Sequence, residues 1–339
     1  MPLLEVENLS VAFTTRKGIA RAVNGVDFSL ESGETLCIVG ESGSGKSVLS
    51  MSILQLLESN GKITGGAVRF RLGDTVVDLT KFTEKAMRKI RGNRISMVFQ
   101  EPMTALNPVL SVGKQLSEPF IVHQNMRKKN ARISAQEMLA KVRIPNPERV
   151  IKQYPHQLSG GMRQRVMIAM ALACKPDILI ADEPTTALDV TIQAQILRLM
   201  KEMQKEKGTA ILFITHDLGV VNEIADKVAV MYAGEVVEYA DRQAIFGNRA
   251  YLHPYTQALK NSLPERAKAG QTLESIEGNV PSPLALPTGC KFAPRCKYRT
   301  EKCFQNHPPL FEVRGKKVRC FYPSIKERES GNHAKLIVR

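Results

Sequence analysis

The 339-residue sequence has no tryptophan, 6% aromatic residues, six cysteines and no uninterrupted apolar run approaching 18 residues. A transmembrane helix needs about 20 predominantly apolar residues, so the sequence predicts no membrane span. Six cysteines in a chain of this length are too few for the disulfide framework of a small secreted domain. Residues 1–7 lack the basic and apolar regions of a signal peptide, so we expect a cytoplasmic protein.

The residues that are present combine an ordinary apolar content with a basic bias. Hydrophobic residues make up 43% of the sequence, which suffices for a sizeable core and excludes a mainly disordered chain. The formal net charge is +15, and residues 249–339 hold 17 Lys and Arg against 7 Asp and Glu. Proline is also frequent in this region, so residues 249–339 are predicted to form a separate, loop-rich unit.

The hydrophobic pattern predicts strands that alternate with helices. Short apolar runs predict strands over residues 4–13, 23–30, 35–39, 95–99, 178–181 and 210–214. Apolar positions at helical spacing predict helices over residues 47–57, 131–142 and 190–205. This alternation indicates a mostly parallel sheet that is covered on both faces. The polar, helical stretch over about 101–172 is predicted to be an inserted helical subdomain.

A glycine-rich motif follows the predicted strand 35–39 and opens the next predicted helix. Residues 40–47 read Gly-Glu-Ser-Gly-Ser-Gly-Lys-Ser, which fits G-x-x-x-x-G-K-[ST]. The glycines allow backbone N–H groups to converge on phosphates, Lys46 supplies a charge for the β- and γ-phosphates, and the Ser47 hydroxyl can ligate Mg²⁺. A turn that merely joins strand to helix is the alternative, which the flanking elements disfavour. The predicted ATP-binding residues here are Gly40, Glu41, Ser42, Gly43, Ser44, Gly45, Lys46, Ser47 and Val48.

Two adjacent carboxylates follow the predicted strand 178–181. Acidic residues at the end of a buried strand face the ligand crevice of an open α/β sheet. Asp182 is placed to hold Mg²⁺ through water, and Glu183 is placed to orient or deprotonate an attacking water. The pair therefore suits phosphoryl hydrolysis, although a solvated turn before Pro184 is the alternative interpretation.

Several short motifs stand in a fixed order around these two sites. Leu-Ser-Gly-Gly-Met-Arg-Gln-Arg occupies residues 158–165, Ala-Leu-Asp occupies 187–189, and Gln100 and His216 each follow a predicted strand. With Phe13 upstream, the ordered set resembles ATP-binding cassette (ABC) proteins over roughly residues 4–245. The resemblance implies that Phe13 stacks on adenine. It further implies the catalytic residues Glu183, His216 and Gln100 and the Mg²⁺ ligands Ser47, Gln100 and Asp182.

The resemblance also implies that the ATP site is completed by a second cassette. Ser159, Gly160 and Gly161 of the signature motif contact the ATP of the opposite subunit, and Asp189 belongs to the D-loop. One departure is Met162, which stands where the family more often has glutamine. We expect it to be tolerated, because Ser159 and the backbone N–H groups at the following helix start contact the phosphate.

A closer resemblance covers nearly the whole chain, to about residue 323. Residues 159–171, 181–191, 253–256 and 289–296 are similar to the ATPases of oligopeptide and dipeptide importers. This implies an ATPase that powers peptide import at the cytoplasmic face of the plasma membrane. The implied partners are two membrane permease subunits, a second and paralogous ATPase, and an extracytoplasmic solute-binding protein. An importer of nickel or of an oligosaccharide is the alternative.

A soluble ABC ATPase that acts on nucleic acid or ribosomes is a more distant alternative, which the charge of +15 invites. The chain has one cassette and no basic stretch interleaved with aromatic residues, so we expect no nucleic-acid partner. The expected fold is therefore α/β: a P-loop NTPase of the ABC type with a mostly parallel sheet core and an antiparallel β N-terminal part. The expected domains are a nucleotide-binding domain over 1–248 and a loop-rich extension with four cysteines over 249–339.

The four cysteines of the extension are Cys290, Cys296, Cys303 and Cys320. Four thiolates suit either zinc or an iron–sulfur cluster, and this spacing lacks the paired C-x-x-C of common zinc sites, so it does not decide between them. Four unrelated, reduced cysteines are the remaining alternative. The resemblance to the importer ATPases implies a [4Fe–4S] cluster of structural role. Basic residues near the cysteines are expected to offset its charge: Lys291, Arg295, Lys297, Arg299, Lys302 and Arg319.

Overall fold

The computed structural model describes residues 1–100, 105–185, 190–247, 252–262, 276–313 and 315–323. The chain divides into two compact units. Unit 1 consists of Met1–Leu3, Leu30–Thr35 and Lys81–Ile214. Unit 2 consists of Leu4–Ser29, Leu36–Thr80 and Thr215–Arg339. The candidate residues for phosphate binding and for hydrolysis are thus shared between the two units, and each unit is described by itself.

Unit 1 contains a parallel group of strands in the order β8-β7-β6. These are β6 (Ile95–Val98), β7 (Ile178–Asp182) and β8 (Ala210–Thr215). Every residue of β7 and β8 is buried, as expected for parallel strands that are covered on both faces. Their register pairs Ile178 with Ala210, so the carboxyl ends of the strands lie at one edge.

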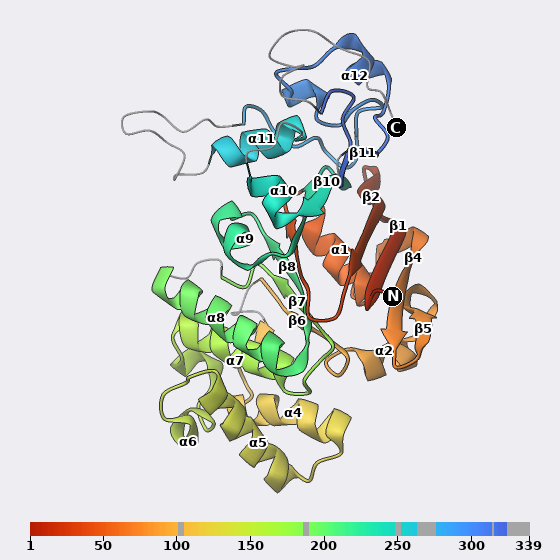
Figure 1. Ribbon diagram of the computed structural model, residues 1–339. Coiled ribbons are helices and arrows are strands. Elements are labelled where there is room, and N and C mark those ends of the chain that lie inside the picture. Colours follow the sequence, from red (N-terminus) through yellow and green to blue (C-terminus); the bar gives the residue numbers. More distant parts are fainter. Residues whose placement is uncertain (101–104, 186–189, 248–251, 263–275, 314, 324–339) are drawn as a thin grey trace. The chain divides into compact units, whose positions relative to one another are not determined.

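Helices make up most of the rest of unit 1, and Figure 1 shows α4 to α7 gathered beside one another. The helix α4 begins where the Ser111 hydroxyl accepts a hydrogen bond from the Lys114 N–H, which is a side-chain cap. The helices of this unit are α2 (Glu84–Ile90), α4 (Val112–Gln124), α5 (Lys128–Lys141), α6 (Pro147–Val150), α7 (Gly160–Leu172) and α8 (Val190–Lys207), with a 3-10 turn over Pro155–Gln157. The predicted inserted helical segment is therefore helical, as α4 to α7.

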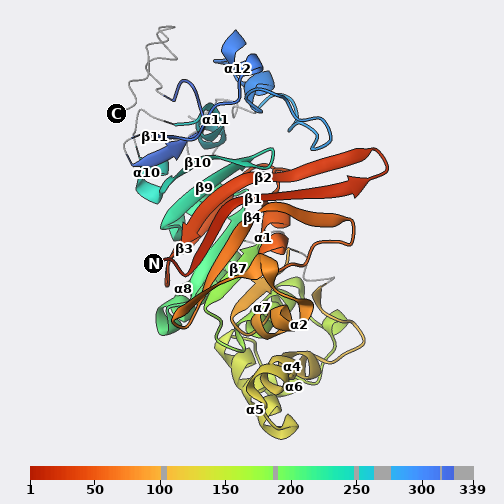
Figure 2. The ribbon, with the colours of Figure 1, turned by 90° about the vertical axis from the view of Figure 1, so that its right-hand side faces the viewer.

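Unit 2 contains a four-stranded sheet in the order β2-β1-β4-β5. These strands are β1 (Leu4–Thr15), β2 (Gly18–Leu30), β4 (Gly61–Leu72) and β5 (Thr75–Asp78). Figure 2 shows β2, β1 and β4 side by side. The strands β1 and β4 run antiparallel, from Leu4 opposite Phe70 to Phe13 opposite Gly61. This sheet is the antiparallel N-terminal part that the sequence predicts.

A second group of strands in unit 2 carries the phosphate motif at one side and the C-terminal region at the other. Its order is β11-β12-β10-β9-β3, with β3 parallel to β9 and the remaining pairs antiparallel. The strands are β3 (Thr35–Val39), β9 (Lys227–Tyr232), β10 (Glu235–Asp241), β11 (Phe311–Val313) and β12 (Lys316–Val318). The helices are α1 (Lys46–Ile53), α9 (Leu218–Ile224), α10 (Arg242–Phe246), α11 (Pro254–Asn261) and α12 (Glu301–Gln305), with 3-10 turns over Leu79–Lys81 and Ala293–Arg295.

The six strands predicted from hydrophobic runs are all present, which confirms an α/β fold with a mostly parallel core. The hydrophobic pattern did not predict the strands β4, β5, β9, β10, β11 and β12. It also predicted that the helix after the phosphate motif extends to residue 57, whereas α1 ends at Ile53. The boundary at residue 248 stays a prediction. In the described part of the chain, no helix is both long and apolar enough to span a bilayer.

Candidate nucleotide-binding site

The phosphate motif forms the connection between β3 and α1 in unit 2, as the sequence predicts. Its glycines are required by close backbone approaches. A Cβ atom at Gly40 would collide with the carbonyl oxygen of Met231 on β9, and one at Gly45 would collide with that of Ala22 on β2. Gly45 also has φ +100°, a backbone angle that residues with a side chain rarely adopt. The loop is therefore pressed against β2 and β9.

The lysine of the motif folds back over the loop. Lys46 is 5% exposed, and its Nζ donates hydrogen bonds to the carbonyl oxygens of Gly40 (2.7 Å) and Glu41 (2.9 Å). Ser44 is fully buried, and its carbonyl oxygen accepts a hydrogen bond from the Gly234 N–H over 2.9 Å. A cation held over a loop at the N-terminus of a helix suits phosphate groups. Ser47 lies half-buried in the first turn of α1, and its binding to Mg²⁺ stays a prediction.

The other predicted nucleotide contacts surround this loop less tightly. Ser42 and Gly43 are exposed, and Val48 is half-buried on α1. The half-buried Phe13 lies on β1 opposite Gly61 of β4, where its ring occupies the space that a side chain at Gly61 would need. Its stacking on adenine stays a prediction.

Unit 1 holds the two acidic residues at the carboxyl end of β7. Asp182 is 2% exposed, and the half-buried Glu183 follows it with φ +45°. The Glu183 N–H donates to the carbonyl oxygen of Ile214 (2.9 Å), which holds this strained turn in place. The Nε2 of Gln100 donates to Oε2 of Glu183 over 3.2 Å, so two of the three predicted catalytic residues meet.

The signature motif begins α7, also in unit 1. The hydroxyl of Ser159 accepts a hydrogen bond from the N–H of Met162 over 3.3 Å and thereby caps the helix. The unusual Met162 thus contributes its backbone at the helix start. Five residues after Ser159, the buried Gln164 donates from Nε2 to the carbonyl oxygen of Pro184 over 2.5 Å. This bond ties the signature helix to the residue that follows Glu183.

The third predicted catalytic residue belongs to the other unit. His216 belongs to unit 2, where it is exposed between β8 and α9. The next residue, Asp217, caps α9 by accepting from the N–H groups of Gly219 (2.8 Å) and Val220 (3.3 Å). Asp189 of the D-loop lies outside the described residues.

The prediction of an iron–sulfur cluster at the four cysteines is wrong. All four cysteines line one narrow pocket of about 20 Å³, which is roughly the space of a single water molecule. Apolar and aromatic side chains such as Phe292 and Phe321 line it too. Within the described ranges, no group of three or more His, Cys, Asp or Glu could hold a metal ion, so the zinc alternative also lacks support.

The basic residues around the cysteines have other partners than a cluster. Lys291 forms an ion pair with Glu235 over 2.7 Å, and Nη1 of Arg295 lies 2.6 Å from Oε2 of Glu41. The ammonium group of Lys302 lies 4.5 Å from the centre of the Phe321 ring. Lys291 and Arg295 therefore neutralise Glu235 and Glu41. The sequence did not reveal these pairs because the paired residues are far apart in the chain.

Two residues of the C-terminal region contact Glu41 of the phosphate loop, and the sequence did not predict either contact. Arg295 binds the Glu41 carboxylate, and the hydroxyl of Tyr255 accepts the Glu41 N–H over 2.8 Å. The hydrogen bonds to Glu41 raise the pKa of Arg295 above its ordinary value, and burial raises the pKa of Tyr255. Both groups keep their protons at neutral pH. No local pattern connects residues that are 254 and 214 positions apart.

Two family models match the chain. Residues 23–186 match the model described as ABC transporter, and residues 237–303 match the oligopeptide/dipeptide transporter C-terminal region. Among solved structures, the dimeric ATP-binding cassette MJ0796 bound to ADP and Pi has a TM-score of 0.63 and 30% identity, covering 70% of this chain and 98% of that one. CbiO1 from Clostridium perfringens, part of the ABC transporter complex cbiONQ, has a TM-score of 0.61 at 30% identity, covering 73% of this chain and 91% of that one.

Curated relatives match over almost the full length. The oligopeptide transport ATP-binding protein AppD of Bacillus subtilis is 54% identical over 321 residues, which cover 94% of this chain and 96% of AppD. The dipeptide transport ATP-binding protein DppD of Haemophilus influenzae is 48% identical over 332 residues, which cover 98% of each chain. The protein therefore belongs to the ABC transporter ATPases, in the family of the oligopeptide/dipeptide transport ATP-binding proteins.

Proposed function

We propose that the protein hydrolyses ATP to power the import of oligopeptides or dipeptides through membrane permease subunits. The observation that carries the proposal is the identity of 48% to 54% with AppD and DppD, which extends over more than nine-tenths of the chain. The buried Lys46 of the phosphate loop and the contact between Gln100 and Glu183 agree with a hydrolytic ATPase.

The phosphate loop binds the triphosphate. Backbone N–H groups of residues 40–48 surround its oxygens. When the triphosphate binds, Nζ of Lys46 leaves the carbonyl oxygens of Gly40 and Glu41 and contacts the β- and γ-phosphates. The ring of Phe13 stacks on the adenine of ATP. Ser47, Gln100 and Asp182 would hold Mg²⁺, which would supply positive charge to offset the negative charge on the phosphate oxygens.

Hydrolysis uses the acidic end of β7. Glu183 accepts a proton from a water molecule as its oxygen attacks the γ-phosphorus, and the bond to the β,γ-bridging oxygen breaks to leave ADP and phosphate. Gln100 orients Glu183 through the hydrogen bond of 3.2 Å. His216 contacts the γ-phosphate and stabilises the charge of the transition state.

A second cassette completes each site. Ser159, Gly160 and Gly161 at the N-terminus of α7 contact the γ-phosphate of the ATP that is bound to the opposite subunit, because a helix N-terminus favours anions. Asp189 lies in the D-loop at this boundary. The γ-phosphate is the contact that differs between ATP and ADP, so ATP closes the pair and hydrolysis opens it. The solved dimeric cassettes, one bound to ADP and Pi, support this pairing.

The complex has further partners and a membrane location. Two permease subunits bind the helical subdomain, a paralogous ATPase is the second cassette, and an extracytoplasmic solute-binding protein delivers peptide. This chain lies peripherally at the cytoplasmic face of the plasma membrane, where its net charge of +15 suits an anionic surface. Residues 1–248 are the nucleotide-binding domain, and residues 249–339 are the C-terminal extension.

Reconstitution in vesicles tests the proposal. The chain is combined with the permeases, the solute-binding protein and the second ATPase of an oligopeptide or dipeptide importer, and ATP-driven uptake of a radiolabelled dipeptide is measured. We expect uptake that Lys46→Ala abolishes, while Lys201→Ala on α8 retains it. Uptake of Ni²⁺ or an oligosaccharide without peptide would reject the peptide assignment, and ATPase activity stimulated by RNA without permeases would reject the transporter assignment.

A further inference from the structure

Glu41, the second residue of the phosphate loop, is held on both sides by the C-terminal region. Its carboxylate receives two hydrogen bonds from Arg295, Nη1 to Oε2 over 2.6 Å and Nη2 to Oε1 over 3.0 Å. Its backbone N–H donates to the hydroxyl of Tyr255 on α11 over 2.8 Å. A bidentate pair of this kind defines orientation as well as distance. All of these residues belong to unit 2.

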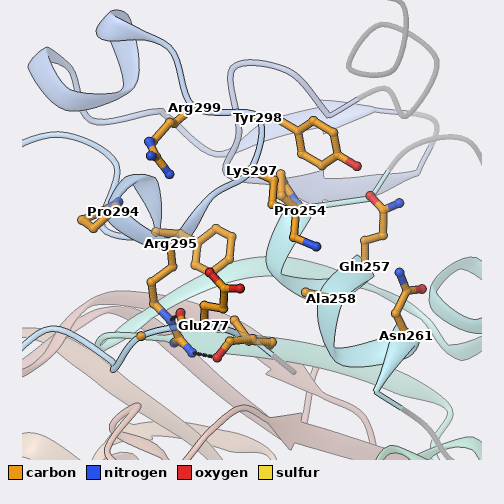
Figure 3. Close-up of a pocket in the computed structure, with 13 residues that line it drawn as sticks. Pro254, Gln257, Ala258, Asn261, Glu277, Pro294, Arg295, Lys297, Tyr298 and Arg299 are labelled. Carbon is orange, nitrogen blue, oxygen red and sulfur yellow. Dashed lines mark hydrogen bonds between the residues drawn. The ribbon is translucent and has the colours of Figure 1, made fainter. Parts of the chain in front are cut away.

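Arg295 is itself fixed before it meets Glu41. Its Nε donates to the carbonyl oxygen of Glu277 (2.9 Å), and Nη2 also donates to that of Ile276 (3.1 Å). Figure 3 shows Arg295 and Glu277 in the lining of a second pocket, between α11 and residues 294–299. Nη1 lies 3.4 Å from the hydroxyl of Tyr232. The Arg295 side chain is 5% exposed. The guanidinium is therefore pre-organised, and it loses little freedom in binding the carboxylate.

An aromatic cluster supports both contacts. The rings of Tyr232 on β9, Tyr255 on α11 and Phe292 lie with centroids 4.7 to 5.4 Å apart, and all three residues are at most 3% exposed. Such tilted packing favours one arrangement of the three segments. Tyr255 and Arg295 thus reach Glu41 from a rigid base.

Glu41 transmits this placement to the lysine of the loop. Its carbonyl oxygen accepts hydrogen bonds from Nζ of Lys46 (2.9 Å) and from the N–H of Ser44 (3.2 Å). The chain of contacts runs from Arg295 and Tyr255 through Glu41 to Lys46. A displacement of Glu41 would turn the peptide groups beside it and move the lysine, and both are groups that we assign to the phosphates.

We propose that Arg295 and Tyr255 are positioning residues for ATP binding, so that the C-terminal extension holds the phosphate loop in its binding-competent shape. The inference rests on the proposed role of residues 40–48. It gives the segment over 290–296 a function in nucleotide affinity. The phosphate loop of this chain is completed by residues more than 200 positions away in the sequence.

The test measures ATP binding and turnover of the full-length chain. Arg295→Gln removes the charge and the bidentate geometry, so we expect the Kd for a fluorescent ATP analogue and the KM for MgATP to rise roughly tenfold, with a smaller fall in kcat. Arg295→Lys keeps one charged donor and restores part of the affinity. Tyr255→Phe retains the ring and removes only the acceptor, so it raises the KM to a lesser extent at an unchanged Tm.

A double-mutant cycle and a matched control separate positioning from folding. Glu41→Gln and Arg295→Gln are expected to raise the KM by similar factors, and the double variant by no more than either, because both remove the same contact. The control is Arg299→Gln, since Arg299 lies four residues after Arg295 but donates to the Cys296 carbonyl oxygen over 3.2 Å instead of to Glu41. It is expected to leave the KM unchanged.

Three results would overturn the inference. They are an unchanged KM in Arg295→Gln, additive effects of Glu41→Gln and Arg295→Gln, and an equal rise of the KM in Arg299→Gln. If Arg295→Gln does not fold, Tyr255→Phe decides the question by the same readout. Lys46→Ala distinguishes the two levels: ATP binding that survives this change refutes the proposed ATP site, whereas its loss together with a normal Arg295→Gln refutes the positioning role alone.

Discussion

Gln100 donates a hydrogen bond from Nε2 to Oε2 of Glu183 over 3.2 Å, although the two residues are 83 positions apart in the sequence. The pair joins the segment after β6 to the end of β7, which are neighbouring parallel strands with Val98 opposite Ala181. Strand ends of a parallel sheet meet at one edge, so side chains that follow them come together there. Glu183 is further defined by its φ of +45° and by its N–H bond to Ile214.

Replacement of Glu183 by glutamine tests the catalytic carboxylate. Glu183→Gln keeps the size of the side chain and removes the base, so we expect kcat to fall by about 100-fold or more while ATP binding persists. ATP should then stabilise the closed cassette pair, which size-exclusion chromatography detects. Glu202→Gln, an exposed carboxylate of α8 in ion pairs with Arg143 and Arg198, is the matched control. Hydrolysis near the wild-type rate would show that Glu183 is not the catalytic base.

The hydroxyl of Ser159 is expected to serve both the helix and the transport cycle. Ser159→Ala removes the cap of α7 and should lower the free energy of unfolding by about 1 kcal/mol. Ser111→Ala removes an equivalent cap from α4 and should cost a similar amount. We expect ATP-driven pairing and ATPase activity to fall in Ser159→Ala alone. Equal activity losses in both variants would mean that Ser159 acts only as a cap.

The buried Gln164 links the signature helix to the catalytic strand end. Gln164→Leu leaves the carbonyl oxygen of Pro184 without its donor, which should cost about 1–3 kcal/mol in the free energy of unfolding. The ATPase rate should fall as well, because Pro184 follows Glu183 directly. Gln136→Leu on the exposed face of α5 is the control, with both quantities near the wild-type values. Urea titration and ATPase assays measure them, and an unchanged rate in Gln164→Leu would contradict the link.

Glu235 is expected to make the stability of unit 2 depend on pH in acid. Burial alone would raise the pKa of Glu235. The hydrogen bond with His307 (2.9 Å) and the ion pair with Lys291 (2.7 Å) outweigh burial and hold this pKa below the ordinary 4.5. The Nε of Arg319 also lies 4.0 Å from Oε2 of Glu235. The ionised form therefore stabilises the fold above pH 4.5, and this contribution is lost as the pH falls through the lowered value. Glu235→Gln should cost about 3 kcal/mol at pH 7, and its difference from wild type should shrink in acid. Urea titrations over a pH series measure the free energy of unfolding of both proteins, and Glu312→Gln, at an exposed position, is the control. A difference between Glu235→Gln and wild type that stays constant over the pH series would contradict the prediction.

Local motifs made much of the fold and of the candidate site predictable. The phosphate motif lies between β3 and α1 as expected, because the glycine conformations, the helix start and the lysine are all encoded within eight residues. The signature motif was identified by its resemblance to the ABC family, and the structure adds that Ser159 caps α7. The strands β4 and β5 were missed because their residues alternate weakly and are only partly buried.

The cysteines show where spacing stops being informative. Their clustering in the sequence does bring all four to one pocket, but within the described residues no group of three or more His, Cys, Asp or Glu could hold a metal ion, and Lys291 and Arg295 have carboxylate partners. A metal site depends on the distances and directions of its ligands, and intervals along a loop-rich segment do not define them.

By itself, the sequence determined the chemistry that is local: a phosphate loop, a carboxylate pair at a strand end, a capped signature helix and a basic, proline-rich extension. Only the tertiary structure decided which charges neutralise one another, bringing Arg295 and Tyr255 to Glu41 and Lys291 to Glu235. The physical reason is that hydrogen bonds and ion pairs act over a few ångströms in space, irrespective of the length of chain between the partners.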